Sequence, residues 1–368
     1  MQRSVTETLL SIPDQGYPVT LSTQLKQHAQ QDGFFHLALN KSQRTQALAR
    51  HLGGQAPQRL FIGANMSGFD YAHPAFEVSR LAPGFFSQGD AAAQAAKREQ
   101  LDGAIVIVNN NDVGRDNGAP FYADFFSRCE RTIFAVWDWD NHHWLDNSSF
   151  AAAHADVYAP AHHENLYLLT RYNPSTLGPV YCATVQWSKA FLADHIGDII
   201  GTERTDQPLG MHVPYGSFTY RNRVVTTLSQ HFPKVGFSSH SFHHRTAEDR
   251  LLEWCQHKLH WIVPVLNDVP IRLFDALITG GIPLVPESMR YLPPVRDIDR
   301  RHIAFYGPED IVNPGPLVQR ALRLFDEGGL EGMVARHRHA LAHHHGQDRV
   351  DDILAGIAEK FEFPLAQR

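Results

Sequence analysis

The first half of the chain contains four short apolar runs, and each run ends in polar or aromatic residues. Segments long enough for helices lie between the runs, such as residues 91–100 and 121–128. Strands that are apolar on both faces and alternate with helices are typical of a parallel sheet that is covered on both sides. In such sheets, ligands bind beyond the carboxyl ends of the strands. The pattern predicts this sheet from residues 60–64, 104–108, 132–136 and 155–159.

A second alternating pattern begins near residue 208. Its expected strands begin at Lys234, His260, Ile282 and His302, and its expected helices are residues 247–257, 271–279, 316–327, 330–344 and 349–361. The chain is therefore expected to have an α/β fold with two Rossmann-like domains. We place the N-terminal domain at residues 1–205 and the C-terminal domain, with the helices that finish the chain, at residues 206–368.

Composition and charge narrow the possible functions. The formal net charge of -6 argues against a face that coats nucleic acid, but it allows a local basic pocket for a diphosphate. The three cysteines form no CxxC pair, which favours a reducing, cytoplasmic location over a disulfide framework. We see no secretory signal, and no run approaches the ~18 apolar residues of a membrane-spanning helix. A peripheral membrane contact stays open.

The most informative segment runs from Arg272 to Pro283. Arg272 and Asp275 are three residues apart at the start of an expected helix, so they share one face of it. The helix-start amides and Arg272 predict a local anion site, and Asp275 could accept hydrogen bonds from a ribose diol. Gly280 and Gly281 let the helix end and let the chain approach a ligand. The alternative is a plain helix–turn–strand connection with a surface ion pair.

The pattern R-x-F-D-A-L-x-x-G-x-I-P in this segment resembles the donor-nucleotide segment of GT-B fold glycosyltransferases, especially the exostosin-like and spore-maturation-protein-like families. The resemblance implies two Rossmann-like domains that face a cleft, with Asp275 on the ribose and Arg272 near the diphosphate. We include Asp268 among the donor-binding candidates. Its spacing from Asp275 is one residue shorter than the acidic pair of many retaining members, so the retaining or inverting outcome stays open.

Arg221 and Arg223 lie in the expected first helix of the second domain. At that end of a GT-B domain, a guanidinium can neutralise the leaving nucleoside diphosphate, which removes the need for a metal. We therefore predict that both arginines bind the donor. The alternative is two solvated arginines on a helix.

The run from Trp137 to Trp144 interleaves indoles with acids and histidines. Aromatic faces suit sugar rings, and Asp or His can take the proton of an acceptor hydroxyl. The alternative is an aromatic loop that closes the sheet edge, with Trp137 and Trp144 in the core. The predicted acceptor-binding residues are Trp137, Trp139 and His143, and the predicted acid–base residues are Asp138, Asp140, His142 and His162.

These observations predict a glycosyltransferase that moves a sugar from a nucleotide-activated donor to a glycan, lipid-linked or protein acceptor, without a metal or another cofactor. The segment Asp138-Trp139-Asp140 also matches the D-x-D pattern of metal-dependent glycosyltransferases, which is a weak signal because it is short. Two further alternatives are a nucleotide-sugar epimerase or hydrolase and a non-catalytic carbohydrate-binding protein. The sequence leaves the donor base, the sugar, the acceptor and the oligomeric state undecided.

Overall fold

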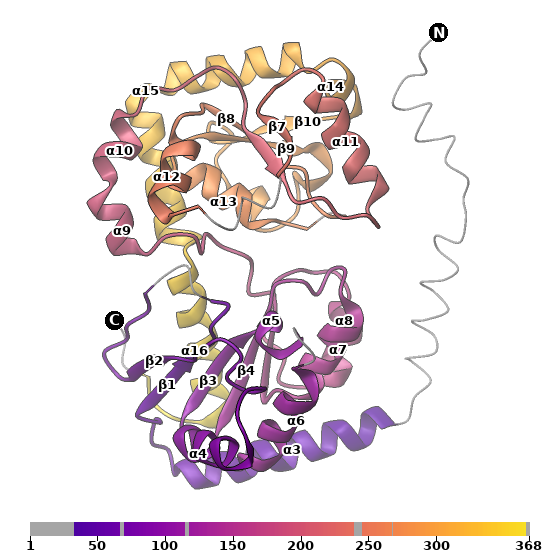
Figure 1. Ribbon diagram of the computed structural model, residues 1–368, viewed down its shortest axis with the longest axis vertical. Coiled ribbons are helices and arrows are strands. Elements are labelled where there is room, and N and C mark those ends of the chain that lie inside the picture. Colours follow the sequence, from indigo (N-terminus) through magenta and orange to yellow (C-terminus); the bar gives the residue numbers. More distant parts are fainter. Residues whose placement is uncertain (1–32, 67–69, 115–117, 239–244, 267, 366–368) are drawn as a thin grey trace. The chain divides into compact units, whose positions relative to one another are not determined.

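The computed structural model describes residues 33–66, 70–114, 118–238, 245–266 and 268–365 (Figure 1). The chain divides into two compact units. Of the described residues, those from 33 to 181 and from 347 to 365 form the first unit, and those from 182 to 346 form the second unit. Each unit is described by itself below.

The first unit is built on a five-stranded sheet with the order β2-β1-β3-β4-β5, in which every pair is parallel. Its strands are β1 (Arg59–Ile62), β2 (Glu77–Arg80), β3 (Ile105–Asn109), β4 (Ile133–Asp138) and β5 (Val157–Pro160). Its helices are α3 (Gly33–Leu52), α4 (Ala91–Leu101), α5 (Asn110–Gly114), α6 (Ala119–Arg128), α7 (Leu145–Ala153), α8 (Leu166–Tyr172) and α16 (Gly346–Phe361). Strands β3 and β4 are buried at every position, as expected for parallel strands with both faces covered. The strand order reverses between β1 and β3, which is the switch point of the sheet.

The second unit repeats this strand order. Its strands are β6 (Gly210–His212), β7 (Val235–Phe237), β8 (Leu259–Trp261), β9 (Ile282–Pro286) and β10 (Ala304–Tyr306). Strands β8, β9 and β10 form one parallel group, and β6 pairs with β7. Leu209, just before β6, joins the groups because its amide donates to Leu259 at 2.9 Å and its carbonyl accepts from Trp261 at 2.7 Å. The order is therefore β7-β6-β8-β9-β10, and the switch point lies between β6 and β8.

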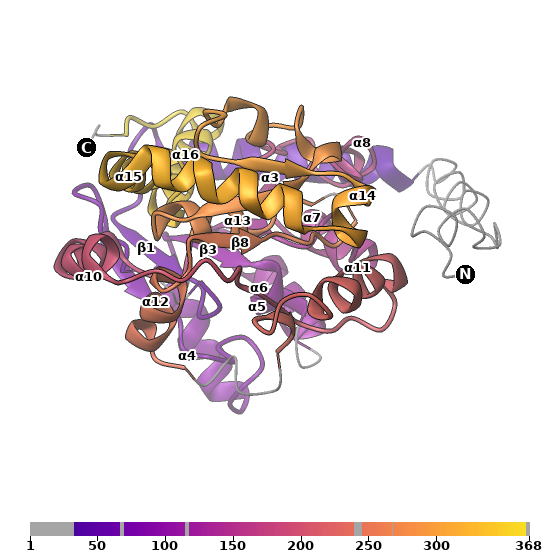
Figure 2. The same ribbon diagram turned by 90° about the horizontal axis from the view of Figure 1, so that it is seen from above.

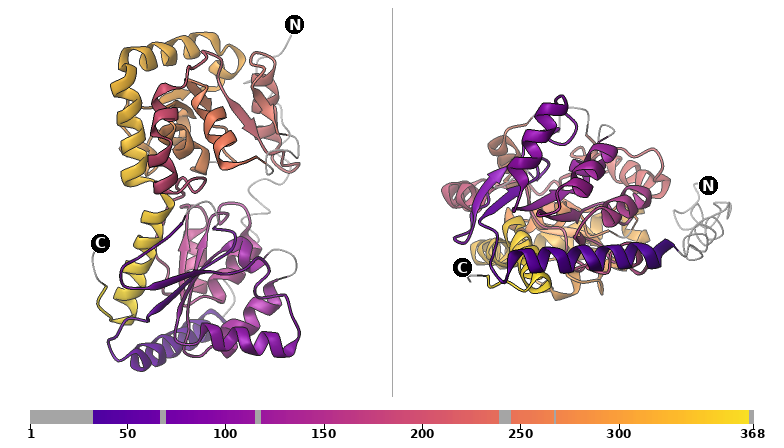
Figure 3. Two further views of the ribbon diagram at one scale, coloured as in Figure 1. Left: turned by 60° about the vertical axis from the view of Figure 1, so that its left-hand side comes forward. Right: turned by 90° about the horizontal axis from the view of Figure 1, so that it is seen from below.

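The helices of the second unit flank this sheet, and α13 packs against α15 (Figure 2). They are α9 (Lys189–Asp194), α10 (Ile196–Gly201), α11 (Thr219–Ser229), α12 (Ala247–Cys255), α13 (Ile271–Ile278), α14 (Pro308–Val312) and α15 (Gly315–His343). Helix α15 consists of two halves that meet at an angle at Gly329, where φ is 50° and ψ is -146° (Figure 3). Glycine tolerates this left-handed backbone at little steric cost. The predicted helices 316–327 and 330–344 correspond to the two halves.

The α/β class with two Rossmann-like domains is confirmed by the two parallel sheets. The compact units differ from the predicted ranges at two places. Residues 182–205 belong to the second unit, because α10 packs on α12 and α15. Helix α16 belongs largely to the first unit, where the Tyr71 hydroxyl donates to Asp351. Within the described residues, no helix combines the length and the apolar character needed to cross a membrane.

Candidate functional site

Arg221 ties together the two strands at the switch point of the second unit. It lies in the first turn of α11 and is only 2% exposed. Its Nη1 donates to the carbonyl of Val213, just after β6, at 2.7 Å, and its Nε donates to the carbonyl of Val263, just after β8, at 3.2 Å. The guanidinium also lies 5.4 Å from the ring of Tyr215. These bonds fix a cation at the carboxyl ends of the two strands between which the strand order reverses. Open α/β sheets bind ligands at this position.

Arg272 adds a second positive charge to this edge. It lies in the first turn of α13, and its charge joins burial in lowering the pKa of Arg221. His212, the last residue of β6, is fully buried. Burial, Arg272 and Arg221 hold the pKa of His212 well below its usual value, so the ring is neutral. Asp268 opposes the two guanidinium charges, yet the edge keeps the donors that an anion requires.

Asp275 is engaged inside the second unit. Its carboxylate accepts a hydrogen bond of 2.6 Å from the Thr184 hydroxyl, and the side chain is buried. Burial raises the pKa of Asp275 to about 7, while the Thr184 bond and the charge of Arg272 oppose that rise. Thr184 itself forms a parallel bridge with His345. Asp275, the residue predicted to bind the ribose, therefore holds the segment around Thr184 within its own unit. Its role toward a ribose stays a prediction.

Gly280 and Gly281 lie at the opposite end of α13 from Arg272, just before β9. A Cβ on Gly281 would lie 2.4 Å from the imidazole of His260, and Gly280 has a φ of 78° next to Met333. Both positions thus require glycine because of the backbone conformation and the close packing at the amino edge of the sheet. This differs from the prediction that the glycines let the chain approach a ligand. Arg223 is exposed and lies two residues after Arg221, so the helix directs the two side chains apart.

Trp137 and Asp138 lie in the core of the first unit rather than at an open edge. Trp137 is fully buried and its Nε1 donates to the carbonyl of Val180 at 2.8 Å. Asp138 is fully buried, and its two carboxylate oxygens accept from the amide of Asp140 at 2.9 Å and from the hydroxyl of Tyr158 at 2.6 Å. Burial raises the pKa of Asp138 to about 6. These contacts correct the prediction that Trp137 contacts an acceptor and the prediction that Asp138 is open to a substrate.

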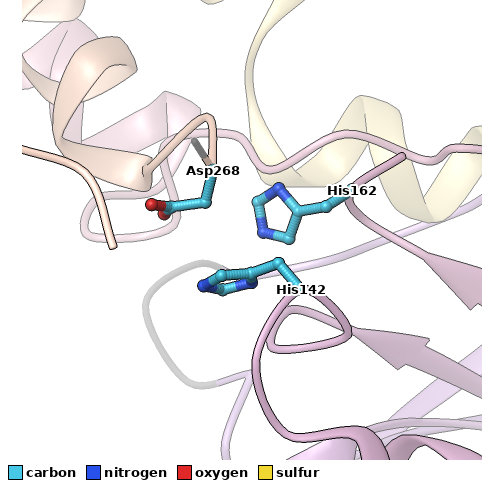
Figure 4. Close-up of side chains that lie close together, drawn as sticks. All are labelled: His142, His162 and Asp268. Atoms are coloured by element: carbon cyan, nitrogen blue, oxygen red, sulfur yellow. The ribbon is translucent and has the colours of Figure 1, made fainter. Parts of the chain in front are cut away.

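The histidines after β4 and β5 form a cluster at the carboxyl edge of the first sheet (Figure 4). The rings of His142 and His162 are edge to face, with centroids 4.4 Å apart. The Nε2 of His142 and the Nδ1 of His143 are 2.8 Å apart and share a proton. The Nδ1 of His142 is buried and has no hydrogen-bond partner among the described residues. His142 thus offers a ring nitrogen to a ligand.

Neighbouring residues fix this cluster. The Nε2 of His162 donates to the carbonyl of Trp139 at 3.0 Å, and burial lowers the pKa of His162 to about 4. Asp140 accepts from the Asn110 side chain at 2.8 Å, and Asn110 in turn accepts from the amide of Trp139 at 3.0 Å. The charge of Asp140 favours a proton on His143, although burial lowers the pKa of that ring overall.

Asp112 is a functional candidate that the sequence reasoning did not select. It accepts from the amide and the side chain of Asn65, after β1, at 3.0 and 2.7 Å, and from the amide of Asn109, at the end of β3, at 3.0 Å. It therefore ties the two strands at the switch point of the first unit. A pocket of about 200 Å³ lies there, lined by Asn65, Asn111, Asp112 and the 81–87 segment. In the sequence, the available signal for Asp112 was the group of polar residues, 109–112, that follows the apolar run 104–108.

No known protein family and no curated protein sequence matches this chain. The chain is similar to solved structures of an alpha,alpha-trehalose-phosphate synthase (UDP-forming) from Burkholderia vietnamiensis, with 10% identity over 74% of this chain and 79% of that chain and a TM-score of 0.41. It is also similar to a sucrose-phosphate synthase from Thermosynechococcus elongatus, with 11% identity over 87% and 92% and a TM-score of 0.45. An alpha,alpha-trehalose 6-phosphate synthase from Burkholderia multivorans gives 9% identity over 82% and 98% and a TM-score of 0.44. The resemblance to the exostosin-like and spore-maturation-protein-like families stays a prediction.

Proposed function

We propose that the protein is a glycosyltransferase that binds a nucleotide-activated sugar on the second unit and a hydroxyl acceptor on the first. The observation that carries the proposal is Arg221, held at the switch point of the second sheet with Arg272 beside it. A nucleoside diphosphate is an anion with several acceptor oxygens, and guanidinium groups bind such oxygens with charge-assisted hydrogen bonds.

The donor side supplies charge stabilisation. When the bond between the sugar carbon and the diphosphate oxygen breaks, the electron pair stays on the diphosphate, and negative charge grows there. Arg221 and Arg272, with the amides at the start of α13, lie ready to stabilise this charge without reorganising. A metal at the D-x-D segment is disfavoured, because both oxygens of Asp138 are occupied inside the first unit.

The acceptor side supplies a base. Burial, His162 and His143 hold the pKa of His142 well below its usual value, so the ring is neutral and its Nδ1 can accept a proton. The acceptor hydroxyl gives its proton to this nitrogen as the hydroxyl oxygen bonds to the sugar carbon. His142 then passes its Nε2 proton to the Nδ1 of His143, which lies 2.8 Å away. The transfer runs toward His143 because the charge of Asp140 favours a proton there. Trp139, partly buried after β4, offers an aromatic face for the acceptor.

A binding screen tests the donor half of the proposal. The full chain is titrated with UDP, GDP, CMP and TDP at constant ionic strength, and thermal stability is recorded. One nucleotide is expected to raise the melting temperature in proportion to its occupancy. Arg272→Met should weaken that binding by about 10- to 100-fold, through the loss of one charged hydrogen-bonding group. Arg223→Met is the matched control, because this side chain is exposed on α11.

Three results would contradict the proposal. Indifference to every nucleotide would favour a carbohydrate-binding protein without catalysis. Equal effects of Arg272→Met and Arg223→Met would remove the switch point as the donor site. If a nucleotide sugar binds but is converted in the absence of any acceptor, the protein is an epimerase or a hydrolase.

A further inference from the structure

A pocket of about 430 Å³ lies in the second unit, away from its switch point. It forms where α15 bends at Gly329, and it is lined by the two halves of that helix and by the segment before β10. Both Gly280, which contacts the lining, and His302 precede their strands, so the pocket lies at the amino edge of the sheet. The size falls within the ~300–1,000 Å³ of small-molecule sites. The proposed function leaves this pocket unused.

Arg336 gives the pocket a buried positive charge. The side chain is fully buried, its Nε donates to the carbonyl of Gly280 at 2.9 Å, and its guanidinium lies 5.0 Å from the ring of Phe325. Its Nη2 has no hydrogen-bond partner, and no carboxylate among the described residues lies within ion-pair distance of it. Burial and the nearby Arg204 lower the pKa of Arg336 to about 10, so it stays protonated at neutral pH. A buried cation without a counter-ion is costly, which an anionic ligand would relieve.

The other lining groups define the rest of the ligand. His302 has a buried Nδ1 without a partner among the described residues, and burial and the charge of Arg336 lower the pKa of its ring. Glu327 and Glu331 are exposed on either side of the bend and offer acceptors for hydroxyl groups. A Cβ on Gly332 would lie 3.2 Å from the Nη1 of Arg336, so glycine leaves room for the buried guanidinium behind the pocket lining.

We propose that this pocket binds a small hydroxylated molecule with one oxyanion group, either a phosphate monoester or a carboxylate. The oxyanion accepts from Arg336 and His302, and the hydroxyls donate to Glu327 and Glu331. The full chain is titrated calorimetrically at constant ionic strength with inorganic phosphate, glycerol 3-phosphate and glycerate. Glycerol 3-phosphate should bind more tightly than inorganic phosphate if phosphate is the recognised group, and glycerate should bind most tightly if it is a carboxylate.

Variants assign the binding to this pocket. Arg336→Met should weaken binding at least tenfold, and Gly332→Ala, which keeps the arginine, should weaken it less. Glu331→Gln removes a repulsive charge from the rim and should tighten inorganic phosphate about threefold. Glu309→Gln, on α14 and outside the lining, is the control and should change nothing.

The proposal is overturned if none of the three probes binds, or if Gly332→Ala and Glu331→Gln both leave the binding unchanged. It is also overturned if Arg272→Met abolishes the binding, because the anion would then occupy the switch point only. That last result would support the donor site, so the two proposals fail separately. Should Arg336→Met not fold, the Gly332 and Glu331 variants decide alone.

Discussion

The two units solve the same structural problem with opposite charges. Each sheet reverses its strand order between its first and third strands, and a side chain bridges the two strand ends at that point. In the second unit, Arg221 donates to backbone carbonyls on both sides. In the first unit, Asp112 accepts from backbone amides on both sides. The topology of the sheet therefore determines where the bridging side chain lies, whereas the residue at that position determines whether its charge is positive or negative.

The charge of the bridging side chain determines which ligands can bind at each edge. A diphosphate is attracted to Arg221 and repelled by Asp112, while a neutral sugar with many hydroxyls tolerates a carboxylate. The carboxyl edge of the first sheet is also closely packed around Asp112, because a Cβ on Gly63 would lie 2.1 Å from the Asp112 carboxylate. The comparison thus supports a donor on the second unit and an acceptor on the first.

The largest expected effect comes from the base. His142→Phe keeps a ring against His162 but removes the unpartnered Nδ1, the nitrogen that we propose as the base. The rate of sugar transfer should fall by about 10²- to 10⁴-fold, while nucleotide affinity stays the same. Both are measured with the nucleotide that the binding screen identifies. His163→Phe is the control, because this histidine is exposed and follows His162 directly. A rate within a few fold of wild type, or a loss of nucleotide affinity, would break the division of roles between the units.

Arg221→Met and Asp112→Ala should cost similar stability, about 3 kcal/mol each, because each leaves two strand ends without their hydrogen bonds. Their effects on nucleotide binding should differ. Arg221→Met should abolish detectable binding, whereas Asp112→Ala should leave the dissociation constant unchanged. Denaturant unfolding and calorimetry measure the two quantities on the same samples. If Asp112→Ala also loses the nucleotide, the contrast between the two switch points has no functional meaning.

The sequence predicted most of the fold because buried parallel strands carry a strong local signal. Strands β3 and β4 are apolar throughout, and the bend in α15 coincides with the glycines that separate two predicted helices. Two strands were missed for identifiable reasons. Strand β2 is an edge strand with the largely exposed sequence Glu-Val-Ser-Arg. Strand β6 has only three residues, and Pro208 and Pro214 nearby read as turn formers.

The candidate site was less predictable, because residue type does not reveal which polar groups are used up inside the fold. Asp138 and Asp275 are carboxylates at expected positions, but Tyr158 and Thr184 bind them within their own units. Arg221 lies where the helix prediction placed it, but the sequence does not reveal that its partners are the carbonyls of Val213 and Val263, which follow two different strands. Asp112 and Asp138 each follow an apolar run, at four residues after Val108 and two residues after Val136, and only the fold distinguishes a bridge from a core residue.

Asp138 provides the smallest expected effect, a pH dependence confined to the first unit. Its folded pKa of about 6 lies above the ~3.9 of an unfolded aspartate, so the folded state holds the proton more tightly. Protonation therefore stabilises the fold at acid pH, and that contribution disappears as the pH rises from about 4 to about 6. Asp138→Asn should abolish the change, since the amide oxygen can still accept from Tyr158. The unfolding free energy of the variant minus that of wild type should increase by about 2 kcal/mol from pH 4 to pH 8, as measured by urea titration at each pH. Asp146→Asn, which removes an exposed carboxyl from the same unit, should run parallel to wild type. If the Asp138→Asn curve also runs parallel, the carboxylate is solvated enough to ionise freely, and Asp138 returns as a candidate base beside His142.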